Sequence, residues 1–578
     1  MKTEKRHRFR MALVVLGMSA ICCALGYRIS DLHLGDHARY LAKLESVRHR
    51  EVEVLVGRGR VLDRNGAVLA ADLSTRDVAV DPAFMKAYGN PYFSASQLSR
   101  LLELDPAVVF ARISKTNSKY ELLKKRVPED VADNIQWMKM PGVRCDERMA
   151  REYPQKSLMA HVVGFANADG VGSSGVEQRF DRYLRGIPGV RQIEVDGRRQ
   201  EIRSRRSLDI SPQAGGDIYL TLDQNLQYFT ESALDAALST NGAKGAWAIV
   251  QRVRTGEILA MASRPDYDLN EYGKVTPEER LNRAIGYVFE PGSVFKIIVY
   301  AAALNEGVLK PDEIIDCENG YWVYGGKGLR DFHPYGRLTA TDALKKSSNI
   351  AAAKVALKIG EDKLYRYLRA FGIGQQTGIE LPGEEYGILH PRNKWSKISI
   401  TRIPMGHEVA TTGLQIVNAL NAIANGGELM RPRVVDRVTT AHGRTIRQSE
   451  PESLGHPIRP EIARTFTEML VHVTEEGTGK RAQLDGYTVA GKTGTAEKPG
   501  PNGYDHKKNI ASFIGFLPAE NPEISILVSF DEPEKFTQGG QVAAPVFREI
   551  AEYATRYLDI PRVDQARLIR LNTDDEIL

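Results

Sequence analysis

The most restrictive feature of this sequence is the short link between two strand-like runs near its C-terminal end. ASFIGFL (511–517) and ISILVSF (524–530) are rich in β-branched, aromatic and aliphatic residues, and only six residues, PAENPE, separate them. Parallel neighbours in a sheet need a crossover of about a dozen residues or more, usually a helix. The link therefore allows an antiparallel hairpin and excludes a parallel pair at this place.

Three further runs are strand candidates, and two others predict helices. AWAIVQRV (246–253) and GEILAMAS (256–263) are joined by a short turn, and YTVAGKTGTAE (487–497) precedes the hairpin. EPGSVFKIIVYAAALNEG (290–307) predicts a helix between a Pro-Gly pair and a final glycine. Because it is apolar almost all round, we expect it to be buried. VAAPVFREIAEYATRYL (542–558) predicts the last helix.

The segment GYTVAGKT, residues 486–493, fits two incompatible interpretations. It matches the G-x-x-x-x-G-K-T pattern of phosphate-binding loops, and SILVSFDE (525–532) resembles the acidic strand that holds magnesium in such proteins. However, residues 487–489 are strand formers where a loop is needed, and Pro-Gly-Pro at 499–501 breaks the helix that must follow. The nucleotide-hydrolase interpretation is therefore rejected, and no nucleotide is expected as a ligand.

The second interpretation is the K-T-G motif of enzymes that acylate a serine. Such enzymes need a nucleophile and a base on one helix, and Ser293 and Lys296 begin the apolar helix with the i, i+3 spacing that shares a face. The helix N-terminus directs backbone N–H groups toward the position of an oxyanion. Burial and neighbouring cations are expected to lower the pKa of Lys296, so that its amine takes the serine proton.

Two further motifs complete this set. The triplet Ser347-Ser348-Asn349 lies on a predicted loop before another helix, where Ser347 supplies a proton-relaying hydroxyl and Asn349 an amide for a peptide group. Lys492-Thr493-Gly494-Thr495 lies on a strand candidate, where the ammonium and hydroxyls suit a carboxylate and Gly494 leaves room for substrate backbone. Each motif alone is weak, since an isolated Ser-x-Asn is more often a helix cap. Their combination and order favour a serine acyltransferase.

No metal or cofactor site is expected. HEVAT, residues 407–411, begins like the H-E-x-x-H helix of zinc proteases, but Thr411 stands where the second histidine is required. Two of the four cysteines, Cys22 and Cys23, lie in an apolar N-terminal segment. The sequence therefore carries no Cys-rich metal signature.

The N-terminal segment predicts a membrane anchor. Residues 11–27 carry no charge and follow the basic decapeptide MKTEKRHRFR. Seventeen residues are at the short end of what spans a bilayer, and no small-x-small cleavage site follows. We therefore expect a cytoplasmic tail at 1–10, a single transmembrane anchor at 11–27 rather than a cleaved signal peptide or a core helix, and the remaining chain outside. Four of the five net positive charges lie in the decapeptide, which argues against nucleic-acid binding.

The 578 residues are too many for one core, so two or more domains are expected. EVEVLVGRGRVLDRNGAVLAADLSTRDVAVDP (51–82) alternates apolar and polar residues around Asn65-Gly66, which is a hairpin signal. A charge-rich segment at 196–216 is interpreted as a solvated linker, and denser apolar sequence follows it. The expected domains are residues 28–215, residues 216–560, and a C-terminal tail, residues 561–578.

From the anchor to about residue 560 the chain resembles the class B penicillin-binding proteins, which are peptidoglycan D,D-transpeptidases. GHEVATT, however, departs from the commonest form of its family segment. The resemblance rests on RGRVLDRNGAVLA (58–70), REYPQKSLMAHVVG (151–164), GSSGVEQRFDRYLRG (172–186), GGDIYLTLDQNLQ (215–227), NRAIGYVFEPGSVFK (282–296), MGHEVATTGLQIVNALNAIANGG (405–427) and GGQVAAPVFREI (539–550).

The resemblance implies an α+β fold. Its parts are an N-terminal transmembrane helix, an elongated α+β pedestal of the dimerisation type, and a transpeptidase domain of the penicillin-binding/β-lactamase-like kind. The transpeptidase domain has a five-stranded antiparallel sheet flanked by helices, which agrees with the five strand candidates.

The resemblance also implies roles for the motif residues. Ser293 would attack the D-alanyl-D-alanine end of a stem peptide, with Lys296 as base and Ser347 assisting. Asn349 would orient the donor peptide, and the run Lys492-Thr493-Gly494-Thr495 would bind its terminal carboxylate. The backbone N–H groups of Ser293 and Thr495 would form the oxyanion hole. The acyl group would then pass to an amine on a neighbouring stem peptide, and β-lactams would remain attached to Ser293.

The single anchor and compact pedestal resemble the division-specific FtsI type, whose members partner a membrane-embedded polymerase of lipid-linked precursor and other division proteins. The elongation-specific type is the nearest alternative. A D,D-carboxypeptidase or a β-lactamase would use the same residues but release the acyl group to water. A non-catalytic cell-wall scaffold is the alternative of a different class, but it would not need three intact motifs.

Overall fold

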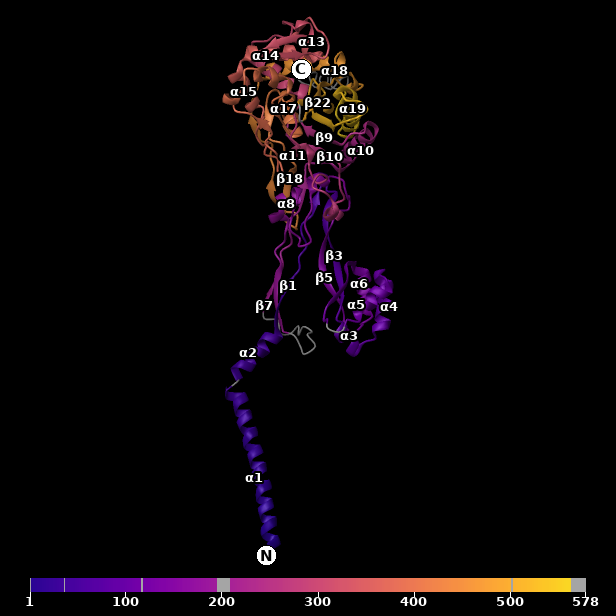
Figure 1. Ribbon diagram of the computed structural model, residues 1–578, viewed down its shortest axis with the longest axis vertical. Coiled ribbons are helices and arrows are strands. Elements are labelled where there is room, and N and C mark those ends of the chain that lie inside the picture. Colours follow the sequence, from indigo (N-terminus) through magenta and orange to yellow (C-terminus); the bar gives the residue numbers. More distant parts are fainter. Residues whose placement is uncertain (1, 36, 116–117, 195–207, 501–502, 563–578) are drawn as a thin grey trace, which may run out of the picture. The chain divides into compact units, whose positions relative to one another are not determined.

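The computed structural model describes residues 2–35, 37–115, 118–194, 208–500 and 503–562 (Figure 1). The chain forms two compact units. One comprises Met1–Gly57 and Gly186–Ala214, and the other comprises Arg58–Arg185 and Gly215–Leu578. Much of the segment expected to form a separate first domain therefore lies in one unit with the segment expected to carry the chemistry.

The first unit contains an N-terminal helix and a small antiparallel sheet of order β1-β6-β7. The stretch Thr3–Gly35 is long and apolar enough to cross a membrane, and it includes the predicted anchor. Of the predicted linker, residues 196–207 lie outside the described residues, and the next three form β7. The elements are α1 (Lys2–Ser30), the π-helical turn η1 (Asp31–Gly35), α2 (His37–Arg48), β1 (His49–Val54), β6 (Gly189–Glu194) and β7 (Leu208–Ile210).

Seven strands of the second unit form one sheet that joins segments far apart in the sequence. Its order is β19-β18-β8-β2-β3-β4, and β5 also pairs with β3. The predicted hairpin at Asn65-Gly66 is confirmed, because β2 and β3 are antiparallel. β2 also pairs in parallel with β8, which follows residue 215 in the chain. The strands are β2 (Val61–Leu62), β3 (Val68–Val80), β4 (Glu121–Pro128), β5 (Val143–Glu152), β8 (Ile218–Leu220), β18 (Val435–Thr439) and β19 (Thr445–Gln448).

Three helices beside this sheet begin in the same way. α3 (Pro82–Tyr88), α4 (Pro91–Leu102) and α5 (Pro106–Ile113) each start with a proline that follows an Asp or Asn. The Asp or Asn side chain accepts a hydrogen bond from an N–H of the first turn, and the proline lacks an N–H where none is needed. With α6 (Glu129–Trp137), these helices enclose a buried cluster that includes Val78, Leu98, Val109 and Ile135.

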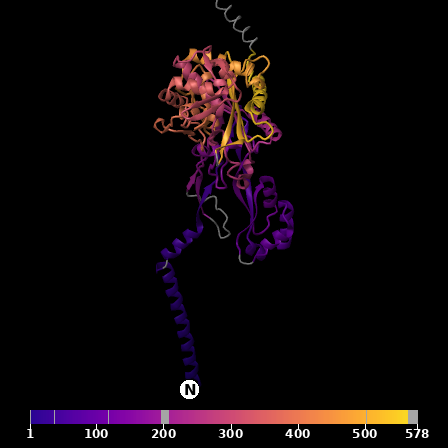
Figure 2. The ribbon, with the colours of Figure 1, turned by 45° about the horizontal axis from the view of Figure 1, so that its top comes forward.

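The second unit also contains the predicted five-stranded antiparallel sheet, in the order β10-β9-β23-β22-β21. The hairpin expected from the six-residue link is confirmed, because β22 and β23 are antiparallel neighbours. The C-terminal strands of this sheet are the gold strands in Figure 2. Every residue of β10 and β23 is buried, which explains why these strands are continuous apolar runs and do not alternate. The strands are β9 (Gly245–Arg252), β10 (Ile258–Arg264), β21 (Ala490–Gly500), β22 (Gly503–Leu517) and β23 (Ile524–Asp531).

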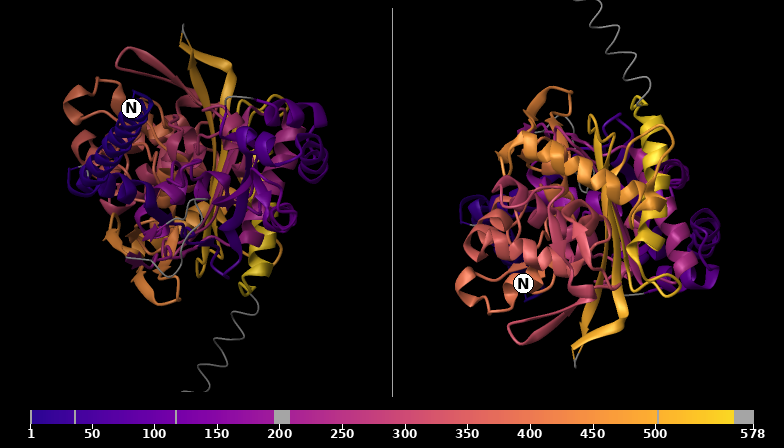
Figure 3. Two further views of the ribbon diagram at one scale, coloured as in Figure 1. Left: turned by 90° about the horizontal axis from the view of Figure 1, so that it is seen from below. Right: turned by 90° about the horizontal axis from the view of Figure 1, so that it is seen from above.

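Helices cover both faces of this sheet, so alternate residues of β9 enter different cores. Ala248 and Val250 belong to a cluster with Phe547 of α19 (Gly539–Tyr557), and α10 (Gln224–Asn241) covers the same face. In the right-hand view of Figure 3, α19 lies beside the strands. Trp247 and Ile249 belong to the other cluster, on the face covered by α17 (Gly413–Ala424).

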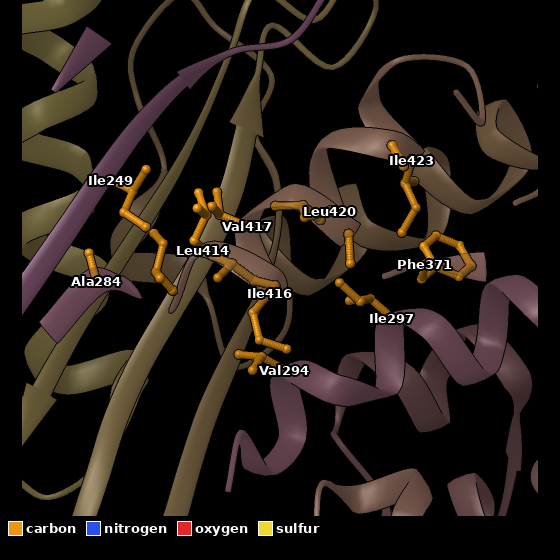
Figure 4. Packing of buried hydrophobic residues seen from close by; sticks show 14 of the residues in the cluster. Ile249, Ala284, Val294, Ile297, Phe371, Leu414, Ile416, Val417, Leu420 and Ile423 are labelled. Carbon is orange, nitrogen blue, oxygen red and sulfur yellow. The ribbon is translucent and has the colours of Figure 1, made fainter. Parts of the chain in front are cut away.

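Helix α17 lies between the sheet and α12 (Lys296–Asn305). Figure 4 shows Leu414 and Val417 on the side of α17 toward Ile249, and Ile416 beside Val294. α14 (Asn349–Ile359) and α18 (Pro460–Glu475) complete this layer, and both contact α12. The helix predicted at 290–307 is therefore buried, as its composition indicates.

Short elements connect these layers. The helices are α7 (Ala160–Val163), α8 (Gly175–Arg179), α9 (Asp181–Leu184), α11 (Arg283–Gly286), α13 (Ala340–Lys345), α15 (Glu361–Ala370) and α16 (Ser399–Arg402). The paired strands are β11 (Ile314–Asp316) with β14 (Arg337–Thr339), β12 (Tyr321–Tyr324) with β13 (Lys327–Arg330), β15 (Ile388–Leu389) with β16 (Val409–Ala410), and β17 (Leu429–Met430) with β20 (Ser453–Gly455). The 3₁₀ turns are η3 (Leu269–Lys274), η4 (Gly292–Phe295), η5 (Glu318–Gly320), η6 (Arg392–Lys394), η7 (Ile403–Met405) and η8 (Lys480–Ala482).

Candidate active site

Ser293 and Lys296 lie side by side, although they do not share one regular α-helix. Ser293 is in the 3₁₀ turn η4, and Lys296 is the first residue of α12. Residues three apart eclipse each other in a 3₁₀ turn, so the predicted shared face is retained. The Nζ of Lys296 is 3.1 Å from the Oγ of Ser293, which is hydrogen-bonding distance.

Lys296 is fully buried and is surrounded by acceptors. Its Nζ lies 2.7 Å from the carbonyl oxygen of Ser347, 3.1 Å from Ser347 Oγ and 2.8 Å from Asn349 Oδ1. Burial lowers the pKa of Lys296 to about 7, and the negative charge of Asp331 opposes that shift. A large fraction of the amine is thus neutral near pH 7 and free to accept a proton. Burial, one of the two causes expected from the sequence, is confirmed, whereas neighbouring cations are not among the causes of this shift.

The Ser347-Ser348-Asn349 triplet forms the loop before α14, as predicted. Ser347 has a left-handed backbone, with φ of 59°, a conformation that non-glycine residues adopt mainly where surrounding structure imposes it. In this conformation its Oγ lies 3.1 Å from Lys296 Nζ and 3.0 Å from Lys492 Nζ. One hydroxyl therefore connects the two buried amines. Ser348 caps α14 by accepting a hydrogen bond from the N–H of Ala351.

Asp331 holds this loop in place, and sequence reasoning did not find it. Its carboxylate accepts hydrogen bonds from the Oγ of Ser348 at 2.6 Å and from the N–H groups of Asn349 and Ile350 at 2.5 and 3.0 Å. A carboxylate at the first turn of α14 also complements the positive end of the helix. Asp331 lies in an irregular segment after β13, where no periodicity or motif spacing marks it.

Lys492, Thr493, Gly494 and Thr495 lie on β21, the outer strand of the five-stranded sheet. Lys492 is fully buried, and burial, followed by the nearby charge of Lys296, lowers its pKa well below the usual value. The hydroxyl of Thr493 is 2.7 Å from that of Thr478, a contact that the sequence did not predict. The exposed Thr495 accepts a hydrogen bond from the N–H of Gly539 through its Oγ1, at 3.2 Å.

Gly494 allows β21 to approach the turn that carries Ser293. A Cβ at position 494 would lie 2.8 Å from Cγ1 of Val294 and 3.3 Å from the carbonyl oxygen of Pro291. Real Cβ atoms do not tolerate the first of these distances without a shift of the neighbour. The sequence suggested that Gly494 makes room for substrate, but the structure gives a nearer reason within the protein.

The four catalytic candidates and Lys492 are thus brought together by hydrogen bonds, and the other three candidates follow Lys492 along β21. Residues 490–500 form a strand, which agrees with rejection of the phosphate-binding loop. Among the described residues, no group of three His, Cys, Asp or Glu side chains is placed to hold a metal ion.

Two family models match most of the chain. The penicillin binding protein transpeptidase domain matches residues 246–552, and the penicillin-binding protein dimerisation domain matches residues 53–220. The chain belongs to the class B penicillin-binding proteins.

Relatives of this class B protein include Stage V sporulation protein D of Bacillus subtilis, which is 33% identical over 97% of this chain and 87% of that protein. The peptidoglycan D,D-transpeptidase FtsI of Escherichia coli is 32% identical over 88% of this chain and 85% of its own length. Among solved structures, penicillin binding protein 3 of Mycobacterium tuberculosis complexed with aztreonam is 27% identical, with a TM-score of 0.70 over 88% of this chain and 98% of that one.

The segment GHEVATT, residues 406–412 of this class B protein, lies against the serine turn. A Cβ at Gly406 would be 2.4 Å from the backbone nitrogen of Gly292, the residue before Ser293. The N–H of Glu408 donates to Glu290 at 3.1 Å, and so does the hydroxyl of Tyr504, also at 3.1 Å. The imidazole ring of His407 stacks on Tyr504, and burial lowers the pKa of this histidine to about 4. A neutral His407 therefore adds no positive charge beside Lys296.

Proposed function

We propose that this protein is a peptidoglycan D,D-transpeptidase that works through an acyl-serine intermediate at Ser293. The observation that carries the proposal is the continuous contact of Ser293, Lys296, Ser347 and Lys492, with the pKa of Lys296 at about 7. The names of the relatives support peptidoglycan as the substrate, because one is a peptidoglycan D,D-transpeptidase.

In the first step, Lys296 accepts the proton of Ser293 as its Oγ attacks the carbonyl carbon between the two D-alanines. The N–H groups of Ser293 and Thr495 stabilise the oxyanion. Two features support this assignment: Ser293 lies in the first turn of η4, and β21 is an outer strand with one edge unpaired in the sheet. The bond to the last D-alanine then breaks, and that amine leaves with a proton relayed through Ser347.

In the second step, an amine of a neighbouring stem peptide attacks the acyl-serine and loses a proton to the same relay. A new amide forms, and the Ser293 hydroxyl is restored. Asn349 orients the donor peptide, while Lys492, Thr493 and Thr495 receive the terminal carboxylate. A bound carboxylate raises the pKa of Lys492, which opposes the effect of burial and favours the ammonium form.

For the cellular setting, we propose a single anchor with the N-terminus in the cytoplasm and the catalytic part outside. The uncharged residues 11–27 within the helical stretch Thr3–Gly35, and the basic residues before them, support this orientation. The resemblance to the division-specific FtsI type supports a role in septal wall synthesis with a membrane-embedded polymerase as partner, and one relative carries the name FtsI. The elongation-specific role is the second candidate.

The decisive experiment is covalent labelling of the detergent-solubilised full chain by a fluorescent penicillin. We expect one label per chain, lost in Ser293→Ala and retained in Ser232→Ala, an exposed serine of α10. A folded parent that takes no label contradicts the acyl-serine proposal and favours the scaffold. A labelled protein that only hydrolyses a donor thioester, with no product when an amine acceptor is added, favours the carboxypeptidase or β-lactamase alternative.

A further inference from the structure

A polar cavity of about 660 Å³ lies in the second unit, between the α8–α9 segment and a wall formed by Gly378, Glu380, the segment before β18, and the end of β19 with the residues that follow it. α8 and β18 are seen near each other in Figure 1. Its walls carry five arginines and only three carboxylates. The lining residues with charge are Arg179, Arg182, Arg431, Arg433, Arg447, Glu380, Glu450 and Glu452.

Some arginines of this cavity already form ion pairs with carboxylates, and others do not. Arg433 is engaged by Glu257 at 2.5 Å, and Arg431 by Glu452 at 3.1 Å. Arg182 donates only to the hydroxyl of Tyr183, at 2.8 Å. Within the described part of the chain, Arg179 and Arg447 form no hydrogen bond or ion pair through their guanidinium groups. Three guanidinium groups, on both walls, are therefore available to an anion.

Part of this charge is buried. The side chain of Arg433 is 8% exposed, and its Nε has no hydrogen-bond partner. Glu380 lines the same wall, where it accepts a hydrogen bond from the N–H of Val434, and burial raises its pKa.

The size and chemistry of the cavity define the ligand class. Guanidinium groups bind carboxylates and phosphates in paired hydrogen bonds. A volume of about 660 Å³ is far larger than one inorganic ion requires and lies in the range of peptide-sized ligands. The lining also includes Glu450, whose carboxylate can accept a hydrogen bond from an N–H group of a peptide, whereas a phosphate dianion offers no donor.

We propose that this cavity binds a short acidic peptide, whose carboxylates pair with Arg179, Arg182 and Arg447. This inference goes beyond the transpeptidase reaction, because none of the cavity residues belongs to the site around Ser293. A ligand held by Arg179 and Arg447 would connect the α8–α9 segment to the β18–β19 hairpin through its own carboxylates.

The test is fluorescence anisotropy of a labelled triglutamate peptide with the detergent-solubilised full chain at low and high salt. We expect saturable binding that weakens with salt, and at least a tenfold loss of affinity in the double variant Arg179→Gln/Arg447→Gln. Arg444→Gln is the matched control, since this exposed arginine lies just before β19 but does not line the cavity. Its affinity should equal that of the parent.

Each of the following outcomes alone overturns the proposal: no binding by the parent, equal binding of a triglutamine peptide, or displacement by inorganic phosphate at the same concentration as by the peptide. Unchanged affinity in the double variant also overturns it. Unfolding temperatures of all variants are compared first. If the double variant does not fold, Arg179→Lys and Arg447→Lys replace it. They keep the charge but lose the paired hydrogen bonds, and each should weaken binding severalfold.

Discussion

The carboxylate of Asp331 accepts a hydrogen bond of 2.6 Å from the hydroxyl of Ser348, the middle residue of the Ser-Ser-Asn triplet. The same carboxylate binds the N–H groups that follow, so it fixes the start of α14 and thereby the positions of Ser347 and Asn349. Asp331 touches neither Ser293 nor the Nζ of Lys296 within hydrogen-bond distance, and we class it as a positioning residue.

Replacing Asp331 with Asn is expected to lower the rate constant of acylation by a β-lactam by roughly tenfold to a hundredfold. The amide retains shape but loses the charge that complements the α14 N-terminus. Removing the negative charge also lowers the pKa of Lys296, since that charge opposes the effect of burial. The acid limb of the pH profile should therefore move to lower pH. The exposed Asp312→Asn serves as control, and an unshifted limb with a normal rate would contradict this role.

The acylation rate of the parent should increase with pH through an apparent pKa of about 7. Lys296 accepts a proton only as a neutral amine, and its lowered pKa means that the neutral form predominates above about pH 7. Stopped-flow acylation between pH 5.5 and 9 measures this limb. Lys296→Arg should lose about 10²–10⁴ in rate, because the guanidinium group stays protonated. A flat profile across this range would exclude Lys296 as the base.

Lys296→Met should raise the unfolding temperature while it abolishes acylation. The amine titrates at about 7 in the folded chain, against the ordinary 10.5, so the unfolded chain binds more protons between these values. The free energy of unfolding of the parent therefore rises with pH across this window. The destabilisation caused by the buried lysine is greatest at pH 7 and below. The increase in unfolding temperature caused by Lys296→Met should be several degrees at pH 7 and should become smaller toward pH 10. The exposed Lys310→Met should bring no such pH-dependent gain.

Gly494→Ala should destabilise the protein by about 1–3 kcal/mol and slow acylation, because the new methyl group meets Val294 at 2.8 Å. Val294→Ala removes that side-chain contact, so the double variant should recover part of the loss. The coupling is measured from unfolding free energies and acylation rates of the four proteins. Additive effects of the two substitutions would show that β21 does not press on the serine turn through this pair.

Local sequence information was sufficient to predict the strands and the motifs. It was insufficient to predict the contacts that position the motif residues in the folded chain. The six residues between Leu517 and Ile524 determine a hairpin whatever surrounds them, and Ser293, Lys296 and Lys492 are recognised by residue type and order. Asp331 and Thr478 act on these motifs from irregular or distant segments, and only the folded chain brings them near. Gly292, with a positive φ of 60°, is likewise approached closely by β21 and Gly406, which no local pattern encodes.

The parallel pairing of β2 with β8 has a practical consequence for anyone who expresses the catalytic part alone. A fragment that begins at Gly216 keeps β8, β18 and β19 but removes β2, so the backbone groups of β8 that β2 satisfies are left at an open sheet edge. Such edges recruit strands from other molecules. We expect this fragment to self-associate, and a fragment that begins before Arg58 to remain monodisperse in gel filtration.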